Sequence, residues 1–262
     1  MLTDDRTMFS PASFSLAACG LVALAFAANA ACPAEAPAPL VAQVIDGDTL
    51  DLADGRTVRL AGIMAPKTPQ ASPTFADAAR RALARLIEGQ PLRLAPTGAG
   101  IDRHGRLLAH VFDREGRWLQ AELVRRGAVR VDTLPDGRER AGELLRFEAE
   151  ARIARRGLWA SNAFAVRDPD AARRYVDRFE LVEGRVLKAD TVAGRVYLNF
   201  GADWRSDFTV AVPRENRPSF SGAGLDLRAL QGKMIRVRGW IQWRDGPLIE
   251  AIHPEQIEVL DP

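Results

Sequence analysis

The feature that most restricts the fold of this chain is a run of alternating apolar and polar residues that begins at Val41. The stretch VAQVIDGDTLDLADGRTVRLAGI, residues 41–63, contains two Asp-Gly pairs, at 46–47 and 54–55. Alternation with a period of two is typical of strands with one buried face, and Asp-Gly pairs favour tight turns. We therefore predict two antiparallel strands joined at residues 53–56.

Helical patterns follow these strands. Residues 72–89 begin with Ser-Pro, repeat apolar residues every three or four positions and end at a glycine, which are the signals of a capped amphipathic helix. Residues 117–127 and 136–157 also end at glycine and predict two further helices. The stretches PLRLAP and RLLAHVFD predict strands, separated by the turn-rich TGAGIDRHG. This mixture predicts an α+β fold, mainly β, in which a small barrel is decorated with helices.

The last third of the chain is again rich in strand patterns. A polar connector at residues 161–177 predicts a linker, and residues 178–262 contain about five apolar, alternating stretches interrupted by glycines. A short helix near residues 226–230 would precede the fourth strand, which is the layout of a five-stranded Greek-key barrel. We expect residues 178–262 to form a second, small OB-like β-barrel domain.

The N-terminus has the features of a targeting segment. An apolar run from Phe14 ends in Ala28-Asn29-Ala30, the small-x-small pattern of a signal-peptidase site. We predict a signal peptide at 1–30, cleaved near Ala30, a disordered lead-in at 31–40 rich in proline and alanine, and a periplasmic or secreted protein without a membrane span in its mature form. A retained N-terminal anchor is the alternative. Cleavage would leave Cys32 as a lone cysteine, so the mature chain would form no internal disulfide, and lipidation of Cys32 stays open.

Composition excludes little. The chain has 36 basic and 34 acidic residues, a formal net charge of +2, which by itself does not indicate a nucleic-acid partner. Its three histidines, at 104, 110 and 253, have no metal-ligand spacing. The sequence contains no Ser/His/Asp or Cys/His arrangement and no phosphate-cradling glycine loop.

A set of motifs nevertheless occurs in a specific order. It consists of VIDGDT (44–49), RLAGI (59–63), DRHGR (102–106), ELVRRGAV (122–129) and RRGLW (155–159). Together with the first predicted helix, this set resembles the staphylococcal nuclease (thermonuclease) domain family over residues 41–160. The resemblance implies a five-stranded OB-type barrel with three helices. It also implies calcium-dependent hydrolysis of DNA and RNA phosphodiester bonds.

The resemblance assigns roles to single residues. Asp48 matches the first metal carboxylate, Asp46 is its neighbour, and Arg59 and Arg106 match the two arginines that grip the phosphate. Arginine suits this role because its fork-shaped guanidinium pairs with two phosphate oxygens at once. Where the family reads Asp-Ala/Thr-Pro-Glu after RLxx[IV], this chain reads Met-Ala-Pro-Lys, residues 64–67.

These substitutions remove two acids that hydrolysis needs. Met64 replaces the second metal carboxylate, and its soft sulfur is a poor ligand for a hard cation. Lys67 replaces the catalytic glutamate, and loss of such a base costs on the order of 10²–10⁴ in rate. The sequence therefore predicts a weak calcium site and impaired hydrolysis. Another acid, such as Asp51 or Asp77, could restore a metal site, and the sequence leaves this open.

Two classes of function remain open. The first is a phosphodiesterase with Asp48 on the metal and Arg59, Arg106 and Lys67 on the phosphate. The second is a non-catalytic binding module of the cell envelope that holds single-stranded DNA, single-stranded RNA, another phosphate ligand or a protein. In that module the Lys67 ammonium would pair with Asp48 or bind phosphate. Outside the family pattern, the two aspartates would be read as turn caps, and Met64 as core packing.

The second barrel offers aromatic and basic side chains that would suit stacking of single-stranded bases. The competing interpretation is that the aromatic side chains fill the barrel core. The aromatic residues are Tyr197, Phe200, Trp204, Phe208, Trp240 and Trp243, and the basic ones are Arg195, Arg205, Arg236, Arg238 and Arg244.

Overall fold

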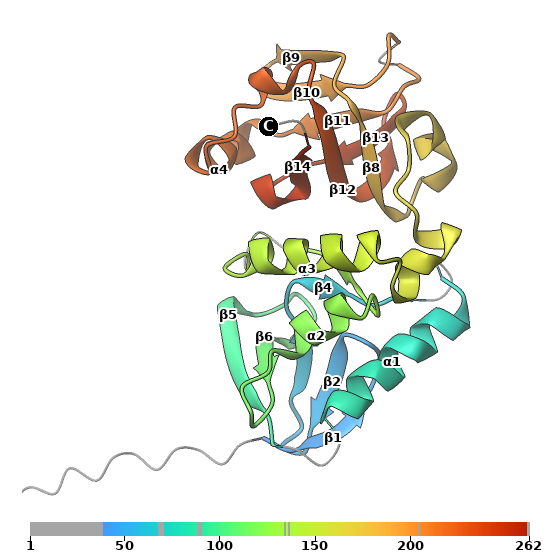
Figure 1. Cartoon of the computed structure of the whole chain (residues 1–262). Coiled ribbons are helices and arrows are strands. Elements are labelled where there is room, and N and C mark those ends of the chain that lie inside the picture. Colours follow the sequence, from blue (N-terminus) through green and yellow to red (C-terminus); the bar gives the residue numbers. More distant parts are fainter. Residues whose placement is uncertain are drawn as a thin grey trace, which may run out of the picture. The chain divides into compact units, whose positions relative to one another are not determined.

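The structure of the protein is a computed structural model that describes residues 39–67, 71–87, 91–133, 135, 137–203 and 205–260. Residues Ala38–Pro262 form one compact unit. Strands and helices are mixed along it, so the fold is α+β as predicted (Figure 1). The predicted signal peptide, its cleavage site, Cys32 and Trp204 lie outside the described residues.

The first sheet is five-stranded, in the order β1-β2-β3-β6-β5 (Figure 1). Neighbouring strands are antiparallel except β3 and β6, which run parallel. Order and direction together are those of an OB-type sheet, in which the third and last strands lie side by side. The strands are β1 (Val41–Val44), β2 (Thr49–Leu52), β3 (Thr57–Leu60), β5 (Arg93–Ile101) and β6 (Leu107–Phe112).

The predicted hairpin is confirmed as β2 and β3. The stretch before it was predicted as part of the first strand, but it contains a separate strand, β1. Gly55 has φ +86° in the turn that joins β2 to β3, a backbone conformation that favours glycine. The chain before it breaks into β1 and a loop, because the N–H groups of Ile45 and Asp46 both donate to the Thr49 carbonyl, at 3.0 and 3.3 Å. β5 also extends through residues 97–101, predicted as a turn, because a register shift lets Ile101 pair with Leu107.

The three predicted helices are present, each shorter than its sequence pattern. The apolar positions of the first, Ala79, Leu83, Leu86 and Ile87, are buried. A two-residue ladder, β4 with β7, lies outside the five-stranded sheet and pairs Ile63 with Val131. These elements are α1 (Pro73–Ile87), α2 (Leu119–Arg125), α3 (Ala141–Ile153), β4 (Ile63–Met64) and β7 (Arg130–Val131).

The second half of the chain forms another sheet, with β12 at its centre. β12 pairs with β8, β13 and β14, all antiparallel, and β13 runs parallel to β11. The sheet continues from β11 through β10 to β9. Its strands are β8 (Phe179–Arg185), β9 (Lys188–Val192), β10 (Arg195–Asn199), β11 (Thr209–Val212), β12 (Met234–Trp243), β13 (Pro247–Glu250) and β14 (Ile257–Val259).

This second sheet repeats the connectivity of the first. Only Val186 and Leu187 separate β8 from β9, so the two segments act as one bent strand. Pairing then runs in a circle from β8 through β12, β13, β11 and β10 back to β9, which is the closure of an OB-type barrel. The exact domain limits at 160 and 178 stay predictions.

The predicted short helix near residues 226–230 is present as a 3-10 helix, but the α-helix that comes before it was not predicted. An α-helix, α4 (Arg217–Gly222), precedes β12, and residues 228–230 form only a short 3-10 turn. The segment RPSFSG carries two serines, a proline and a glycine, which by local propensity favour a loop. Phe220 decides the outcome, because burial of its ring in the barrel core stabilises the turn that carries it.

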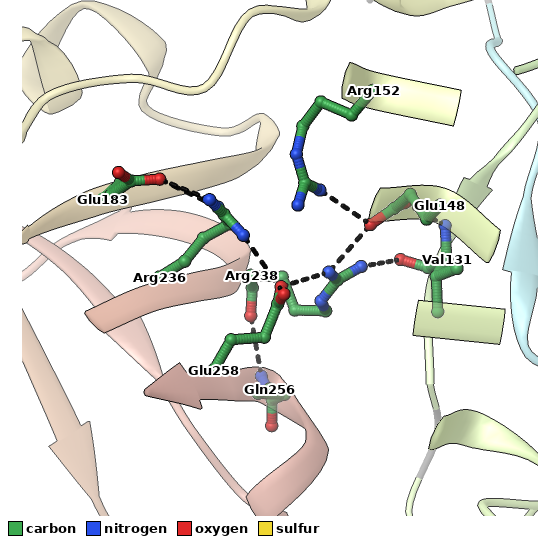
Figure 2. Close-up of polar contacts among 8 residues, drawn as sticks. All are labelled: Val131, Glu148, Arg152, Glu183, Arg236, Arg238, Gln256 and Glu258. Carbon is green, nitrogen blue, oxygen red and sulfur yellow. Dashed lines mark hydrogen bonds and ion pairs between the residues drawn. The ribbon is translucent and has the colours of Figure 1, made fainter. Parts of the chain in front are cut away.

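A buried cluster of charged side chains joins the second barrel to α3 and β7, as Figure 2 shows. Arg238 of β12 donates to Glu148 of α3 at 2.8 Å, to Glu258 of β14 at 2.7 Å and to the carbonyl of Val131 at 3.1 Å. Glu148 in turn accepts the N–H of Val131 at 2.7 Å. We call Arg238, Glu148 and Glu258 the Arg238 cluster. It fixes both polar groups of Val131, and through the ladder it supports β4.

The two interpretations of the aromatic and basic side chains of this barrel each hold for part of the set. Phe200 and Phe208 lie in the core, 5.1 Å apart between ring centroids, and Arg238 is fully buried. Trp240 and Trp243 of β12 are exposed instead. Among the described residues, no helix combines the length and apolar character that a bilayer span requires.

Candidate functional site

The candidate site is built on the loop between β1 and β2. The carboxylate of Asp46 accepts the N–H of Asp48 at 2.9 Å, which closes a local turn. Gly47 lies between them against α1, where a Cβ atom would come within 2.5 Å of the Ala79 side chain. A larger residue would push the loop off the helix, so glycine is required here for close approach.

The side chain of Asp48 is completely buried. It accepts hydrogen bonds from the Thr49 hydroxyl at 2.9 Å and from the backbone N–H of Ala65 at 2.6 Å. The second bond ties the β1–β2 loop to the segment that follows β4. A guanidinium nitrogen of Arg59 lies 3.4 Å from the same carboxylate.

Arg59 lies on β3 and is held by backbone carbonyls. It donates to Leu60 at 2.8 Å and to Ile63 at 2.7 Å. Its guanidinium is mostly buried, so these bonds fix its direction. The predicted phosphate-gripping arginine is therefore a rigid cation beside Asp48.

Lys67 completes the group. It stands where the family pattern has a glutamate, and its positive charge lies between the two aspartates. Its ammonium lies 3.0 Å from Asp46 and 3.4 Å from Asp48, bridging the two carboxylates. The Lys67 side chain is 44% exposed, so one side of the ammonium faces solvent. We call Asp46, Asp48, Arg59 and Lys67 the Asp48 site.

The two carboxylates have opposite pKa shifts. Burial raises the pKa of Asp48 above its ordinary value, although Arg59 and Lys67 oppose this. Burial acts in the same direction on Asp46, but the hydrogen bonds from Asp48 and Lys67 outweigh it and lower the pKa of Asp46. The pKa shift therefore favours the charged carboxylate at Asp46 and disfavours it at Asp48.

Arg106 lies in a different environment from Arg59. Its guanidinium pairs with Asp102 at 2.7 Å, and Asp102 also accepts the backbone N–H groups of His104 and Arg106. The next residue, Leu107, pairs with Val58 of β3. Arg106 therefore lies immediately before β6, which neighbours the strand of Arg59, while its own ion pair is with Asp102.

Met64 packs as a hydrophobic side chain. It lies partly buried against a cluster that contains Trp159, Phe164 and Phe179. On β4 it pairs with Arg130 of β7. Its packing is that of the core residue considered as an alternative from the sequence.

The acids that would restore a metal site are engaged elsewhere. Asp51 accepts the Thr57 hydroxyl at 2.6 Å across the hairpin, and Asp77 pairs with Arg80 and Arg81 on α1. Among the described residues, no three His, Cys, Asp or Glu side chains gather in a way that would hold a metal ion. Since calcium takes six to eight oxygen ligands, two carboxylates already bridged by an ammonium do not fit it.

Asp132, an acid near the site, was not identified from the sequence. Burial raises the pKa of Asp132 to about 6, although the charges of Arg59 and Arg130 lower it, and Asp48 contributes to the increase. Its backbone N–H donates to Gly62 at 3.1 Å, beside the β4–β7 ladder. A single aspartate after a two-residue strand carries no local signal, and only the ladder brings it to this place.

The fold and the site define an OB-type α+β protein with two carboxylates, Asp46 and Asp48, held beside two cations, Arg59 and Lys67. Residues 57–161 match the family model of the staphylococcal nuclease homologues. The chain belongs to this family. It is 33% identical over 130 residues to a micrococcal nuclease of Shigella flexneri, an alignment that covers 46% of this chain and 72% of that protein.

Other relatives give the same result. The chain is 35% identical over 131 residues to protein ParB of Escherichia coli, across 46% of this chain and 71% of that protein. It is 31% identical over 111 residues to a probable staphylococcal-like nuclease, CAN1, of rice (Oryza sativa subsp. japonica). That alignment covers 42% of this chain and only 31% of the rice protein.

Proposed function

We propose that this protein uses the Asp48 site to bind single-stranded DNA, single-stranded RNA or another phosphate ligand, and that its calcium-dependent hydrolysis is impaired. The supporting observation is the Lys67 ammonium, 3.0 Å from Asp46 and 3.4 Å from Asp48. A family member would need a dication between such carboxylates. Here a protein cation stands there, and calcium at most binds weakly.

The charges of the site suit an anionic ligand at its open side. Arg59 and Lys67 bring two positive charges to the site, beside the carboxylates of Asp46 and the buried Asp48. A phosphate oxygen would meet the exposed side of the Lys67 ammonium first. Arg106 would join after exchanging its partner Asp102 for phosphate, since arginine pairs with either in the same geometry.

The nuclease family supports nucleic acid as the ligand class, and export to the periplasm or beyond rests on the N-terminal sequence alone. A protein-binding module of the envelope remains the alternative function. The outcome of a binding assay separates the two, because a protein-binding module has no need of Arg59 or Lys67.

The test is cleavage and binding of fluorescent single-stranded DNA and RNA by purified residues 31–262, with calcium titrated against a chelator. We expect no calcium-dependent cleavage above that of an Arg59→Ala/Arg106→Ala variant, and binding that weakens roughly tenfold in Lys67→Ala, about the effect of one charge-assisted contact. Arg244→Ala is the matched control, because Arg244 is an exposed cation of the second barrel. Calcium-dependent cleavage that the double variant loses would overturn the impairment, and equal binding by Lys67→Ala would overturn the role of the ammonium.

A further inference from the structure

A cavity of about 260 Å³ opens beside Lys67. Its walls come from the segment after β4 on one side and from β8 and β12 of the second barrel on the other. Pockets that hold drug-sized molecules measure roughly 300–1,000 Å³. The size of this cavity therefore suits a single planar group rather than a length of polymer.

One wall of the cavity is aromatic. Trp240 is 46% exposed and meets Phe179 edge to face, with ring centroids 6.4 Å apart. The two residues pair across β12 and β8, so the sheet fixes their relative position. A half-exposed tryptophan at the edge of a cavity offers a flat face on which a base can stack.

The charged side chains of the cavity are mostly basic. Lys67, Arg130 and Arg178 line it together with one acid, Glu180, which pairs with the buried Arg167 at 3.2 Å. Arg130 donates to the Phe179 carbonyl at 2.6 Å and lies 5.0 Å from the centre of the Phe179 ring. Its guanidinium is thus held in place as part of the wall.

We propose that this cavity accepts one base of a single-stranded nucleic acid whose phosphate lies at Lys67, with the base stacked on Trp240. Lys67 belongs both to the Asp48 site and to the cavity lining, so the two are continuous. The inference rests on the proposed function and adds to it that the second barrel contributes a base subsite. Under it, affinity depends on the bases of the strand as well as on its phosphates.

The experiment compares two ligands of equal length and charge, a short fluorescent oligothymidylate and a strand of abasic sugar-phosphates, by fluorescence anisotropy without calcium. The protein should bind the oligothymidylate roughly 5- to 100-fold more tightly, the effect of one aromatic stacking platform. Trp240→Ala should abolish this preference while leaving abasic binding unchanged. Trp240→Phe should keep most of it, which also shows that the barrel remains folded.

Trp243→Ala is the matched control, because Trp243 lies on the same strand, is 59% exposed and is not part of the cavity wall. It should bind both strands as the parent does. Equal binding of the two strands by the parent would overturn the base subsite and leave the phosphate site standing. Loss of the preference in Trp243→Ala but not in Trp240→Ala would move stacking to another face and overturn the assignment. Absence of binding to either strand would overturn the proposed function and the subsite with it.

Discussion

The Asp48 site and the Arg238 cluster each place a buried charged group among opposite charges, but only one is open to solvent. The two terminal nitrogens of the Arg238 guanidinium donate to two carboxylates and a carbonyl, and the side chain lies fully inside. At the Asp48 site, the Lys67 side chain is 44% exposed. A closed cluster contributes to the stability and specificity of the fold, whereas charged groups of an open site can still bind a ligand at the surface.

The pKa values reflect the same difference. Burial lowers the pKa of Arg238, but the charges and hydrogen bonds of Glu148 and Glu258 outweigh it and raise the pKa above its ordinary value. At Asp48, burial prevails over the neighbouring cations and the pKa is raised, which disfavours the charged carboxylate. The closed cluster stabilises the charged form of Arg238, whereas burial at the open site disfavours the charged form of Asp48.

The largest effect is expected from a variant that gives the Asp48 site the two acids of the family pattern. A Met64→Asp/Lys67→Glu variant restores both acids of the family pattern, and we expect calcium-dependent cleavage of single-stranded DNA to rise on the order of 10²–10⁴-fold over the parent. Cleavage rates with calcium and with chelator measure it. The single variant Lys67→Glu is the control, and it should gain less because Met64 still supplies no oxygen. A double variant as inactive as the parent would mean that more than these two residues disables the site.

The second prediction tests the closed cluster. Arg238→Ala leaves Glu148 buried without its strongest partner, so the free energy of unfolding should fall by about 3–5 kcal/mol. Urea denaturation measures the loss. An Arg238→Met/Glu148→Leu variant, which removes both buried charges, should recover part of it. A loss below about 1 kcal/mol for Arg238→Ala would mean that the cluster does not join the two sheets.

The third prediction concerns pH at the border of the open site. Because the pKa of Asp132 is raised from 3.8 to about 6, the folded protein holds a proton that the unfolded chain releases, and stability falls as pH rises through this window. Above pH 7 the free energy of unfolding of Asp132→Asn should therefore exceed that of the parent by up to about 3 kcal/mol, and below pH 4 the two should match. Urea titrations from pH 4 to 8 check this. Parallel pH profiles of the two proteins would contradict the raised pKa.

The smallest effect should come from an exposed ion pair. Arg244 lies 3.4 Å from Glu250 with its side chain 53% exposed. Its replacement by alanine should change the free energy of unfolding by no more than about 0.5 kcal/mol, because solvent screens such pairs. Comparison with Arg238→Ala in the same urea assay sharpens the contrast between exposed and buried arginines of one barrel. A loss as large as that of Arg238→Ala would remove the contrast.

Local patterns predicted the parts of the fold that local physics decides. Alternation and the Asp54-Gly55 turn predicted the β2–β3 hairpin, and apolar spacing predicted α1. The ordered motifs predicted the neighbourhood of Asp48, Arg59 and Lys67. In each case the partners lie close in sequence or share a pattern that defines their place.

Long-range packing decided what the sequence did not predict. The sequence placed Arg238 only among basic residues that would suit a groove; its carboxylate partner Glu148 lies 90 positions away, and no local signal links them. Asp132 reaches the site only through the β4–β7 ladder. The α4 helix forms because the core buries Phe220, against the local propensity of its neighbours.

The separation of Glu148 from Arg238 also matters while the chain is being made. Glu148 leaves the ribosome 90 residues before its partner exists, roughly 5–20 s at ordinary elongation rates. During that interval Glu148 has partners only from the N-terminal half, the Val131 N–H and Arg152, so the Arg238 cluster is still incomplete. The Arg238 cluster is therefore completed only after β12 and β14, the strands that carry Arg238 and Glu258, have been made.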